Sequence, residues 1–485
     1  MLSCSEKIRH EYCCTVVQIG ECFPIEGADR IQRTVVNGMD MVISKDIKPG
    51  DIMIYAANET ELLPSFLSVN NQYGISDYAL NANHNEVQRL IDEDKKDEAK
   101  KLCGFFTQQN RVKMLKLKGI YSFGFLFKPE SLHNWLPATA DIDFSSLVGE
   151  DFDTVGGVRF VKAYVPKTLQ KPDKPNSDTN EKKQKDFDRL IPENFSFHYD
   201  SLQLVRYPEA IQPDDIIDVS TKMHGKSAIF GRVECRIPAP LTFGQKVYNS
   251  IVKLFTKKEE YLFPGFYVEQ DDIYSSRTVL KNRWCSSKKP LEDTTTTTDE
   301  WGYVHKILKS YLRDNLLVYG ELLGYQPGTN KFLQKGYDYG CKPGECKFMP
   351  YRIVTIDGPD YIEWDVQEVN NWTIAMKEYS PELDELLVTM PILYHGPAKD
   401  MYRIKVNDKW NEKFLAKLKS DHKKLGMESL ETLCRSKVPR EGICIRIEGD
   451  KYPRNFKLKS ALFSAKESAN VDQGIIDEEV LESYE

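Results

Sequence analysis

The sequence predicts an α+β protein in which a strand-rich N-terminal region precedes a larger region of mixed strands and helices. Three observations support this. Short β-branched and aromatic runs, separated by turn pairs such as Asn37-Gly38, fill residues 1–165. From residue 187 such runs alternate with helical patterns, up to about residue 470. Residues 166–186 have almost no apolar side chains with which to offset their ordering entropy, so we expect a flexible linker there.

Composition fits this organisation. The chain has 485 residues, of which 41% are hydrophobic, and this suffices for two or three domains with full cores. No apolar run of eighteen residues is present and the start is polar, so we expect no membrane span and no secretion signal. The eleven cysteines at irregular spacing are typical of reduced thiols in the cytoplasm. The net charge of −7 means that any nucleic-acid contact must come from local basic patches.

The N-terminal region should form a small antiparallel barrel with one helical insertion. The insertion is expected at residues 83–103, which are polar and charged and contain no Gly or Pro. Strands are expected at residues 14–19, 33–36, 39–44, 51–55, 111–117 and 122–127. Arg111, Lys113 and Lys116 lie in the fifth of these and form a candidate nucleic-acid patch, although a solvated charged strand face fits them equally well.

The second region should combine sheets with helices, the latter at residues 242–257, 304–314 and 411–425. Strand patterns at residues 216–219 and 228–233 flank His224-Gly225. Because glycine tolerates positive φ, we expect a hairpin here that holds Lys222 at a sheet edge, facing a pocket. Residues 471–485 are acidic and should form a frayed tail.

Lys222 is the candidate nucleophile. A lysine attacks only as a neutral amine, so its pKa must be lowered by burial or by nearby cations, and the supporting groups must come from elsewhere in the chain. Lys-x-His-Gly is a weak signal alone, but four further motifs follow it in order. They are Ser275-Ser276-Arg277, Val318-Tyr319-Gly320-Glu321, Glu441-Gly442-Ile443-Cys444-Ile445-Arg446 and Phe456-Lys457-Leu458-Lys459.

This ordered set resembles the covalent nucleotidyltransferase superfamily of DNA ligases, RNA ligases and mRNA capping enzymes. His224, where DNA ligases and capping enzymes usually have Asp, is similar to the RNA ligase branch. Segments 27–31, 48–55 and 111–119 resemble the N-terminal domain of Deinococcus-type RNA ligases. The resemblance implies an OB-like β-barrel domain followed by a nucleotidyltransferase domain of antiparallel sheets and helices, similar to ATP-grasp ligases.

The resemblance also implies an activity. An ATP-dependent RNA ligase would join 3′-OH and 5′-phosphate ends, with nicks in RNA or RNA/DNA duplexes as the expected substrate. It would use ATP and Mg²⁺ or Mn²⁺ and pass through lysyl-AMP and an adenylylated 5′-end, and we expect it to act as a monomer. The alternatives are a DNA ligase, a capping-type guanylyltransferase, or an inactive ligase-like protein that only binds nucleic acid.

The site residues follow from the motifs. Lys457 and Lys459 are two apart on a strand, so they share one face and could neutralise phosphate charge. Glu441 begins an alternating strand, and its carboxylate suits a hard divalent cation. The resemblance implies nucleotide contacts from Thr221, Gly225, Arg277, Glu321 and Tyr351, the last as the aromatic that stacks on adenine.

Overall fold

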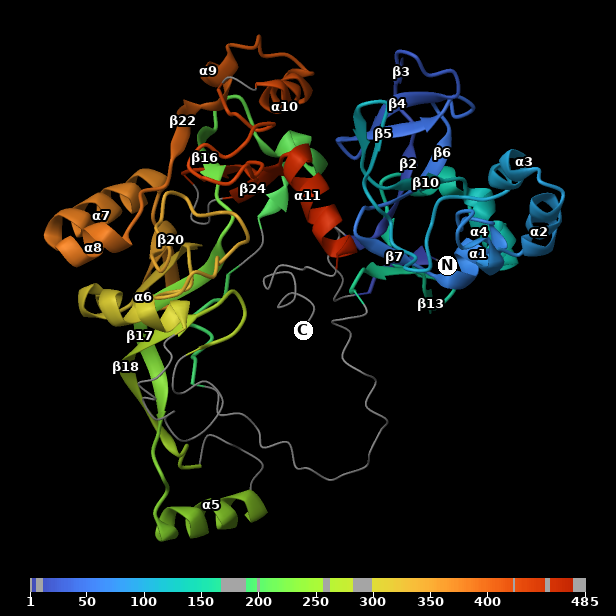
Figure 1. Ribbon diagram of the computed structural model, residues 1–485. Helices are drawn as coiled ribbons and strands as arrows, with labels where there is room; N and C mark the ends of the chain where they lie inside the picture. Colours follow the sequence, from blue (N-terminus) through green and yellow to red (C-terminus); the bar gives the residue numbers. More distant parts are fainter. Residues whose placement is uncertain are drawn as a thin grey trace. The chain divides into compact units, whose positions relative to one another are not determined.

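The computed structural model describes residues 2–5, 12–166, 189–198, 201–255, 262–281, 299–421, 424–449 and 454–473 (Figure 1). The chain divides into two compact units. The first comprises Met1–Pro175 together with Ser464–Ile475, and the second comprises Asn176–Phe463 with Ile476–Glu485. The predicted linker and acidic tail lie almost entirely outside the described residues. No described helix is long and apolar enough to cross a membrane.

Short antiparallel strands dominate the first unit. They form sheets of order β10-β6-β2-β11, β3-β4-β5 and β1-β12-β13 and the pairs β14-β7 and β8-β9. The strands are β1 (Leu2–Ser3), β2 (Cys14–Gln18), β3 (Cys22–Pro24), β4 (Ile31–Val36), β5 (Met39–Ser44), β6 (Ile52–Ala56), β7 (Thr60–Leu62), β8 (Leu115–Leu117), β9 (Ile120–Ser122), β10 (Phe125–Phe127), β11 (Asp151–Phe152), β12 (Thr154–Val155), β13 (Val158–Arg159) and β14 (Val161–Ala163). Among the residues described, these sheets do not close into a barrel.

Local sequence signals set several of these elements. Asn37 and Gly38 both have positive φ, as a two-residue hairpin turn between β4 and β5 requires. The insertion at residues 83–103 is helical as predicted, with α2 (His84–Asp92) and α3 (Lys96–Lys101). The unit also contains α1 (Pro64–Val69), α4 (Pro129–Trp135) and the short 3₁₀ helices η2 (Tyr78–Leu80), η3 (Pro137–Thr139) and η4 (Phe144–Leu147).

The predicted strand at residues 111–117 is wrong in its first half, because only β8 is regular there. The Arg111 side chain is fully buried, and its guanidinium donates to Glu59 at 2.6–2.7 Å, to Asp472 at 2.8 Å and to Ser468 Oγ at 2.8 Å. All of these partners lie in the first unit, to which Ser464–Ile475 belongs. Arg111 therefore holds the unit together and is closed to a nucleic-acid strand.

Replacing Arg111 by leucine should lower the free energy of unfolding of the first unit by about 3 kcal/mol, because two carboxylates lose their buried counter-charge. Thermal or urea unfolding measures the change. Arg89→Leu is the matched control, since Arg89 forms an exposed ion pair with Glu93 at the end of α2 and its replacement should cost far less. Equal costs for the two variants would contradict a structural role for Arg111.

The second unit is built on two five-stranded sheets. Sheet I has the order β15-β24-β23-β16-β22 and sheet II the order β18-β17-β19-β20-β21. Sheet I contains β15 (Leu202–Gln203), β16 (Ile216–Lys222), β22 (Ile392–Pro397), β23 (Gly442–Ile447) and β24 (Arg454–Lys459). Sheet II contains β17 (Lys226–Pro238), β18 (Phe266–Ser275), β19 (Leu316–Gly324), β20 (Cys346–Asp357) and β21 (Asp360–Glu363).

Helices cover these sheets and confirm the predicted α+β class with antiparallel sheets. The helices of this unit are α5 (Phe243–Phe255), α6 (Glu300–Leu308), α7 (Val366–Tyr379), α8 (Pro381–Leu386), α9 (Ala398–Tyr402) and α10 (Trp410–Ser420), with 3₁₀ helices η5 (Leu204–Arg206), η6 (Pro208–Ala210) and η8 (Lys309–Tyr311). Most of α11 (Ala461–Asp472) belongs to the first unit. Figure 1 shows α5 at the far end of the long β17 and β18. Trp301 of α6 and Trp372 of α7 pack into one core with Phe348 of sheet II. Two predicted boundaries shift, because α6 begins at Glu300 and α10 ends at Ser420.

The expected hairpin around Gly225 is wrong. β16 pairs with β22 and β23, whereas β17 pairs with β18 and β19, so the chain passes from one sheet to the other between Lys222 and Lys226. Gly225 does not have positive φ. A Cβ at this position would lie 2.2 Å from the Leu322 carbonyl oxygen, so glycine is required by close backbone packing.

Candidate active site

Lys222 ends β16 on a polar face of sheet I. Its register partner is Gly442 on β23, which in turn pairs with Lys459 on β24. The next row of the same face contains Ser220, Cys444 and Lys457, because side chains two apart point to the same side. The structure therefore brings together three lysines, at 222, 457 and 459, from two distant parts of the sequence.

Thr221 lies on the opposite face. It is buried and pairs with Ile443, which pairs with Leu458. The alternation along β16 that points Lys222 toward the polar face turns the Thr221 side chain away from it. The structure thus does not bring this predicted nucleotide contact to the site.

Glu441 lies beside the nucleophile. Its Oε1 is 3.0 Å from Lys222 Nζ, and its Oε2 is 3.7 Å from His224 Nδ1. Burial alone would raise the pKa of this carboxyl, but the charges of Lys222, His224 and Lys459 outweigh burial and lower the pKa below the usual value. Glu441 is therefore a buried carboxylate that stays ionised within a cationic site.

Glycine at 442 allows this approach of strands. Its φ is +150°, and a Cβ would lie 2.1 Å from the Leu458 carbonyl oxygen. No other residue fits between Lys222 and Lys459 without moving β24. The Glu-Gly pair in the motif therefore combines a charged side chain at 441 with a glycine at 442, because position 442 has no room for a side chain.

The residues after Lys222 are fixed by residues of sheet II and its loops. The His224 backbone N–H donates to the Tyr339 hydroxyl at 2.7 Å, and its ring packs edge-on against Tyr337 and Phe463. The Gly225 N–H donates to Glu321 Oε1 at 2.9 Å. Glu321, predicted to contact the nucleotide, therefore also holds the turn that follows the nucleophile.

Lys226, the residue after Gly225, has its own buried partner. Its Nζ lies 2.8 Å from Glu300 Oε1, and 5.4 Å from the centre of the Trp301 ring. Both partners belong to the first turn of α6. Sequence reasoning missed this pair because nothing near Lys226 in the chain indicates which glutamate it meets.

His198 is a second residue that sequence reasoning missed. Burial and four neighbouring cations lower its pKa to about 3, so the imidazole is neutral. The cations are Arg277, Arg352, Lys222 and Lys457. Two of the predicted site residues, Arg277 and Lys457, thus lie near the nucleophile around one half-buried histidine.

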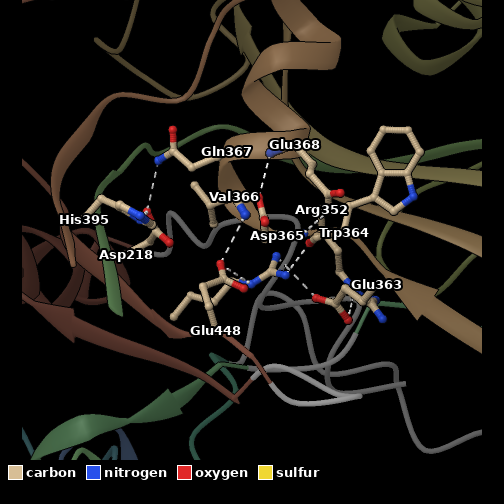
Figure 2. Close-up of polar contacts among 11 residues, drawn as sticks. Asp218, Arg352, Glu363, Trp364, Asp365, Val366, Gln367, Glu368, His395 and Glu448 are labelled. Carbon is tan, nitrogen blue, oxygen red and sulfur yellow. Dashed lines mark hydrogen bonds and ion pairs between the residues drawn. The ribbon is translucent and has the colours of Figure 1, made fainter. Parts of the chain in front are cut away.

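A polar network on the same face of sheet I links it to sheet II (Figure 2). Arg446 of β23 contacts Glu448 at 3.0 Å and Glu363 at 3.5 Å, and Glu363 lies 2.9 Å from Arg352 of β20. The Val366 N–H at the start of α7 donates to Glu448 at 3.1 Å. Two buried arginines and two buried carboxylates therefore bridge the sheets that carry the site.

Asp218 is the other end of this network. It is buried on β16, in the same row as Arg446, and its Oδ1 lies 3.0 Å from His395 Nδ1. Burial is the main cause that raises the pKa of Glu448 to about 7, and hydrogen bonding with Asp218 raises it further against the pull of Arg446. The Glu448 carboxyl therefore keeps its proton at low pH and up to about neutral pH.

Glu448→Gln should flatten the pH dependence of stability. Because the pKa of Glu448 is raised from 4.5 to about 7, its contribution is complete below about pH 4.5 and is lost as pH rises through 7. The amide keeps an acceptor for Arg446 and a donor for Asp218 at every pH, so at pH 8 the variant should be more stable than the wild type by about 1–2 kcal/mol. Urea unfolding at pH 5 and pH 8 measures this, with exposed Glu412→Gln as control. Parallel pH profiles for wild type and Glu448→Gln would refute the raised pKa of Glu448.

The residues present fit a single divalent cation. Among the residues that the structure describes, the buried Oε2 of Glu441 has no hydrogen-bond partner and lies 3.7 Å from His224 Nδ1. In the described part of the chain, no three His, Cys, Asp or Glu side chains gather as a metal site. One carboxylate with an open oxygen suits Mg²⁺ or Mn²⁺ that takes its other ligands from water and substrate phosphates.

Comparison with known proteins identifies the family and the fold. A family model described as RNA ligase matches residues 216–465. The structure is similar to Naegleria gruberi RNA ligase with PPi, at 15% identity and a TM-score of 0.50, over 95% of this chain and 100% of that chain. A mutant of the same enzyme with ATP and Mn has 14% sequence identity and a TM-score of 0.50. Another mutant, with AMP and Mn, has 15% identity and a TM-score of 0.50. Each match covers 93% of this chain and 98% of that chain. No curated protein sequence matches. At these identities the likeness shows a shared fold.

Proposed function

The chain belongs to the RNA ligase family, and from this we propose that it is an ATP-dependent RNA ligase in which Lys222 attacks the α-phosphorus of ATP, expels pyrophosphate and becomes lysyl-AMP. AMP then passes to a 5′-phosphate, and a 3′-OH displaces it. The observation that carries the proposal is the contact of Lys222 with Glu441, on a face shared with Lys457 and Lys459.

Glu441 has two tasks in this proposal. As the partner of Lys222 it aligns the amine while its charge favours the ammonium form. Bound Mg²⁺ or Mn²⁺ would neutralise phosphate charge at this position. Glu441 would hold such a cation, and with its charge offset in this way the Lys222 amine would lose its proton more readily.

The remaining site residues serve the nucleotide. We assign Lys457 and Lys459 to the α-phosphate, since they present two ammonium groups from the strand beside Gly442. Arg277 suits the ribose or a phosphate oxygen, because its planar fork can donate twice. Tyr351 of β20 is assigned to stacking on adenine, and Glu321 to the nucleotide sugar through the turn at Gly225.

For the first unit we propose an OB-like domain of the Deinococcus type that holds a nicked RNA or RNA/DNA duplex. Exposed lysines support this. Lys116 lies over the Tyr121 ring at 4.7 Å, and Lys113 is partly exposed beside Asp472. We further propose that the enzyme acts as a monomer in the cytoplasm, where the described cysteines, all free thiols, would stay reduced.

Removing both lysines should weaken binding to a nicked duplex and lower the slope of log Kd against log salt concentration by about one to two. Lys113→Ala with Lys116→Ala is compared with Lys96→Ala with Lys100→Ala, which removes the same charge from exposed positions on α3. Binding is measured between 50 and 200 mM salt, and lysyl-AMP formation should not change. If both pairs behave alike, the β8 region does not hold the duplex.

The proposed function is tested by incubating the protein and Mg²⁺ with α-labelled ATP, α-labelled GTP or labelled NAD. We expect a covalent adduct with ATP alone. An adduct with GTP alone would indicate a capping-type enzyme, and the absence of any adduct would refute the proposal. A nicked duplex with RNA or DNA on either side of the break then defines the substrate.

A further inference from the structure

The segment at residues 189–198 is tied to sheet II and delivers one side chain to the site. Leu190 forms a β-bridge with Cys235, and Arg236 N–H donates to the Arg189 carbonyl at 2.9 Å. Near the other end, the Tyr319 hydroxyl donates to the Ser196 carbonyl at 2.7 Å. The backbone is thus fixed on both sides before the chain reaches His198.

His198 meets the predicted adenine-stacking residue. Its Nδ1 lies 3.2 Å from the Tyr351 hydroxyl, and the two rings meet edge to face with centroids 5.8 Å apart. Tyr351 also packs in a cluster with Met223, the residue after the nucleophile, and with Leu323. The His198–Tyr351 pair therefore lies between the segment that enters this unit and the strand that carries Lys222.

The charge state of His198 suits this position. Burial and the surrounding cations keep the ring neutral, so one of its nitrogens accepts a hydrogen bond. Nδ1 can accept from the Tyr351 hydroxyl while Nε2 carries the proton. A protonated histidine could not accept that bond.

We propose that His198 is a positioning residue for nucleotide binding, which holds the Tyr351 ring, through the hydroxyl, in the orientation that stacks on the adenine of ATP. This rests on the proposed function, because it assigns Tyr351 to the nucleotide of the same reaction. The effect should appear in the affinity for ATP, since the bond orients a contact made equally before and during phosphoryl transfer.

The test uses His198→Phe, which keeps a ring but removes the acceptor, and His198→Gln, which keeps an acceptor. Tyr351→Phe removes the donor, and the double variant completes a cycle. His305→Phe is the matched control, since His305 is also half-buried and neutral and packs on a tyrosine, Tyr274, with ring centroids 4.7 Å apart. Lysyl-AMP formation is followed in the full-length protein over a range of ATP concentrations.

We expect His198→Phe and Tyr351→Phe each to raise the KM for ATP roughly two- to tenfold with little change in kcat, as for loss of one neutral hydrogen bond. The double variant should be no worse than either single one, because both remove the same bond. His198→Gln should recover part of the loss, and His305→Phe should match the wild type.

An unchanged KM in His198→Phe, or additive effects in the double variant, would overturn the inference while leaving the proposed function intact. Failure of the wild-type protein to form any adduct would instead refute the proposed function. If His198→Phe does not fold, Tyr351→Phe and His198→Gln test the inference in its place. An unchanged KM for ATP in Tyr351→Phe would show that the His198–Tyr351 hydrogen bond has no role in nucleotide binding.

Discussion

Lys222→Ala is expected to abolish lysyl-AMP formation, with a loss on the order of a thousandfold or more, because the substitution removes the nucleophile itself. The side chain is 26% exposed, so its truncation leaves little cavity and the fold should persist. Labelling with α-labelled ATP, read on a denaturing gel, measures the loss, and circular dichroism checks the fold.

Two companion variants sharpen this test. Lys222→Arg keeps a positive charge beside Glu441 but cannot become a neutral amine, so it should be as inactive as alanine. Lys347→Ala removes a partly buried lysine from β20 and should label normally. If Lys222→Ala still forms the adduct, another residue is the nucleophile.

Glu441→Gln is expected to slow lysyl-AMP formation by about a hundredfold or more, since it removes both the charge that aligns Lys222 and the proposed metal ligand. The amide has nearly the shape of the carboxylate, which limits any effect on packing. The rate should be measured against Mg²⁺ and Mn²⁺ concentration, because a lost ligand raises the metal concentration needed for half-maximal rate.

Glu431→Gln is the matched control for this change. Glu431 is equally buried and also forms an ion pair, with Arg440 at 3.4 Å, but it is not one of the predicted ligands. It should label at close to the wild-type rate. If Glu441→Gln is slow but needs the same metal concentration as the wild type, Glu441 only aligns Lys222. If Glu441→Gln reacts at the wild-type rate, Glu441 has no role in the reaction.

Sequence predicted the elements better than their pairing. Strand patterns located β16, β17 and β23, because alternation along a strand is a local property. Pairing is not local. The hairpin prediction failed since Gly225 packs against the backbone of Leu322, almost a hundred positions away, and no turn rule includes that neighbour.

The same limit applies to the site. The order of the motifs was sufficient to predict Lys222, Glu441 and Lys459 as one group, and the antiparallel register places these residues side by side. It gave no indication of His198, which belongs to no motif. It also presented Arg111 as an exposed cation, because its partner Asp472 is 361 positions later.

The placement of Ser464–Ile475 in the first unit has a consequence for synthesis on the ribosome. Strands β2 to β14 emerge early, yet the carboxylate of Asp472 and the hydroxyl of Ser468 that complete the Arg111 cluster are translated long afterwards. Until then the Arg111 guanidinium lacks its hydrogen-bond partners Asp472 and Ser468. This part of the first unit therefore stays accessible to water. We expect it to reach its final protease resistance after the second unit has been made, which reverses the usual order in which domains mature from the N-terminus.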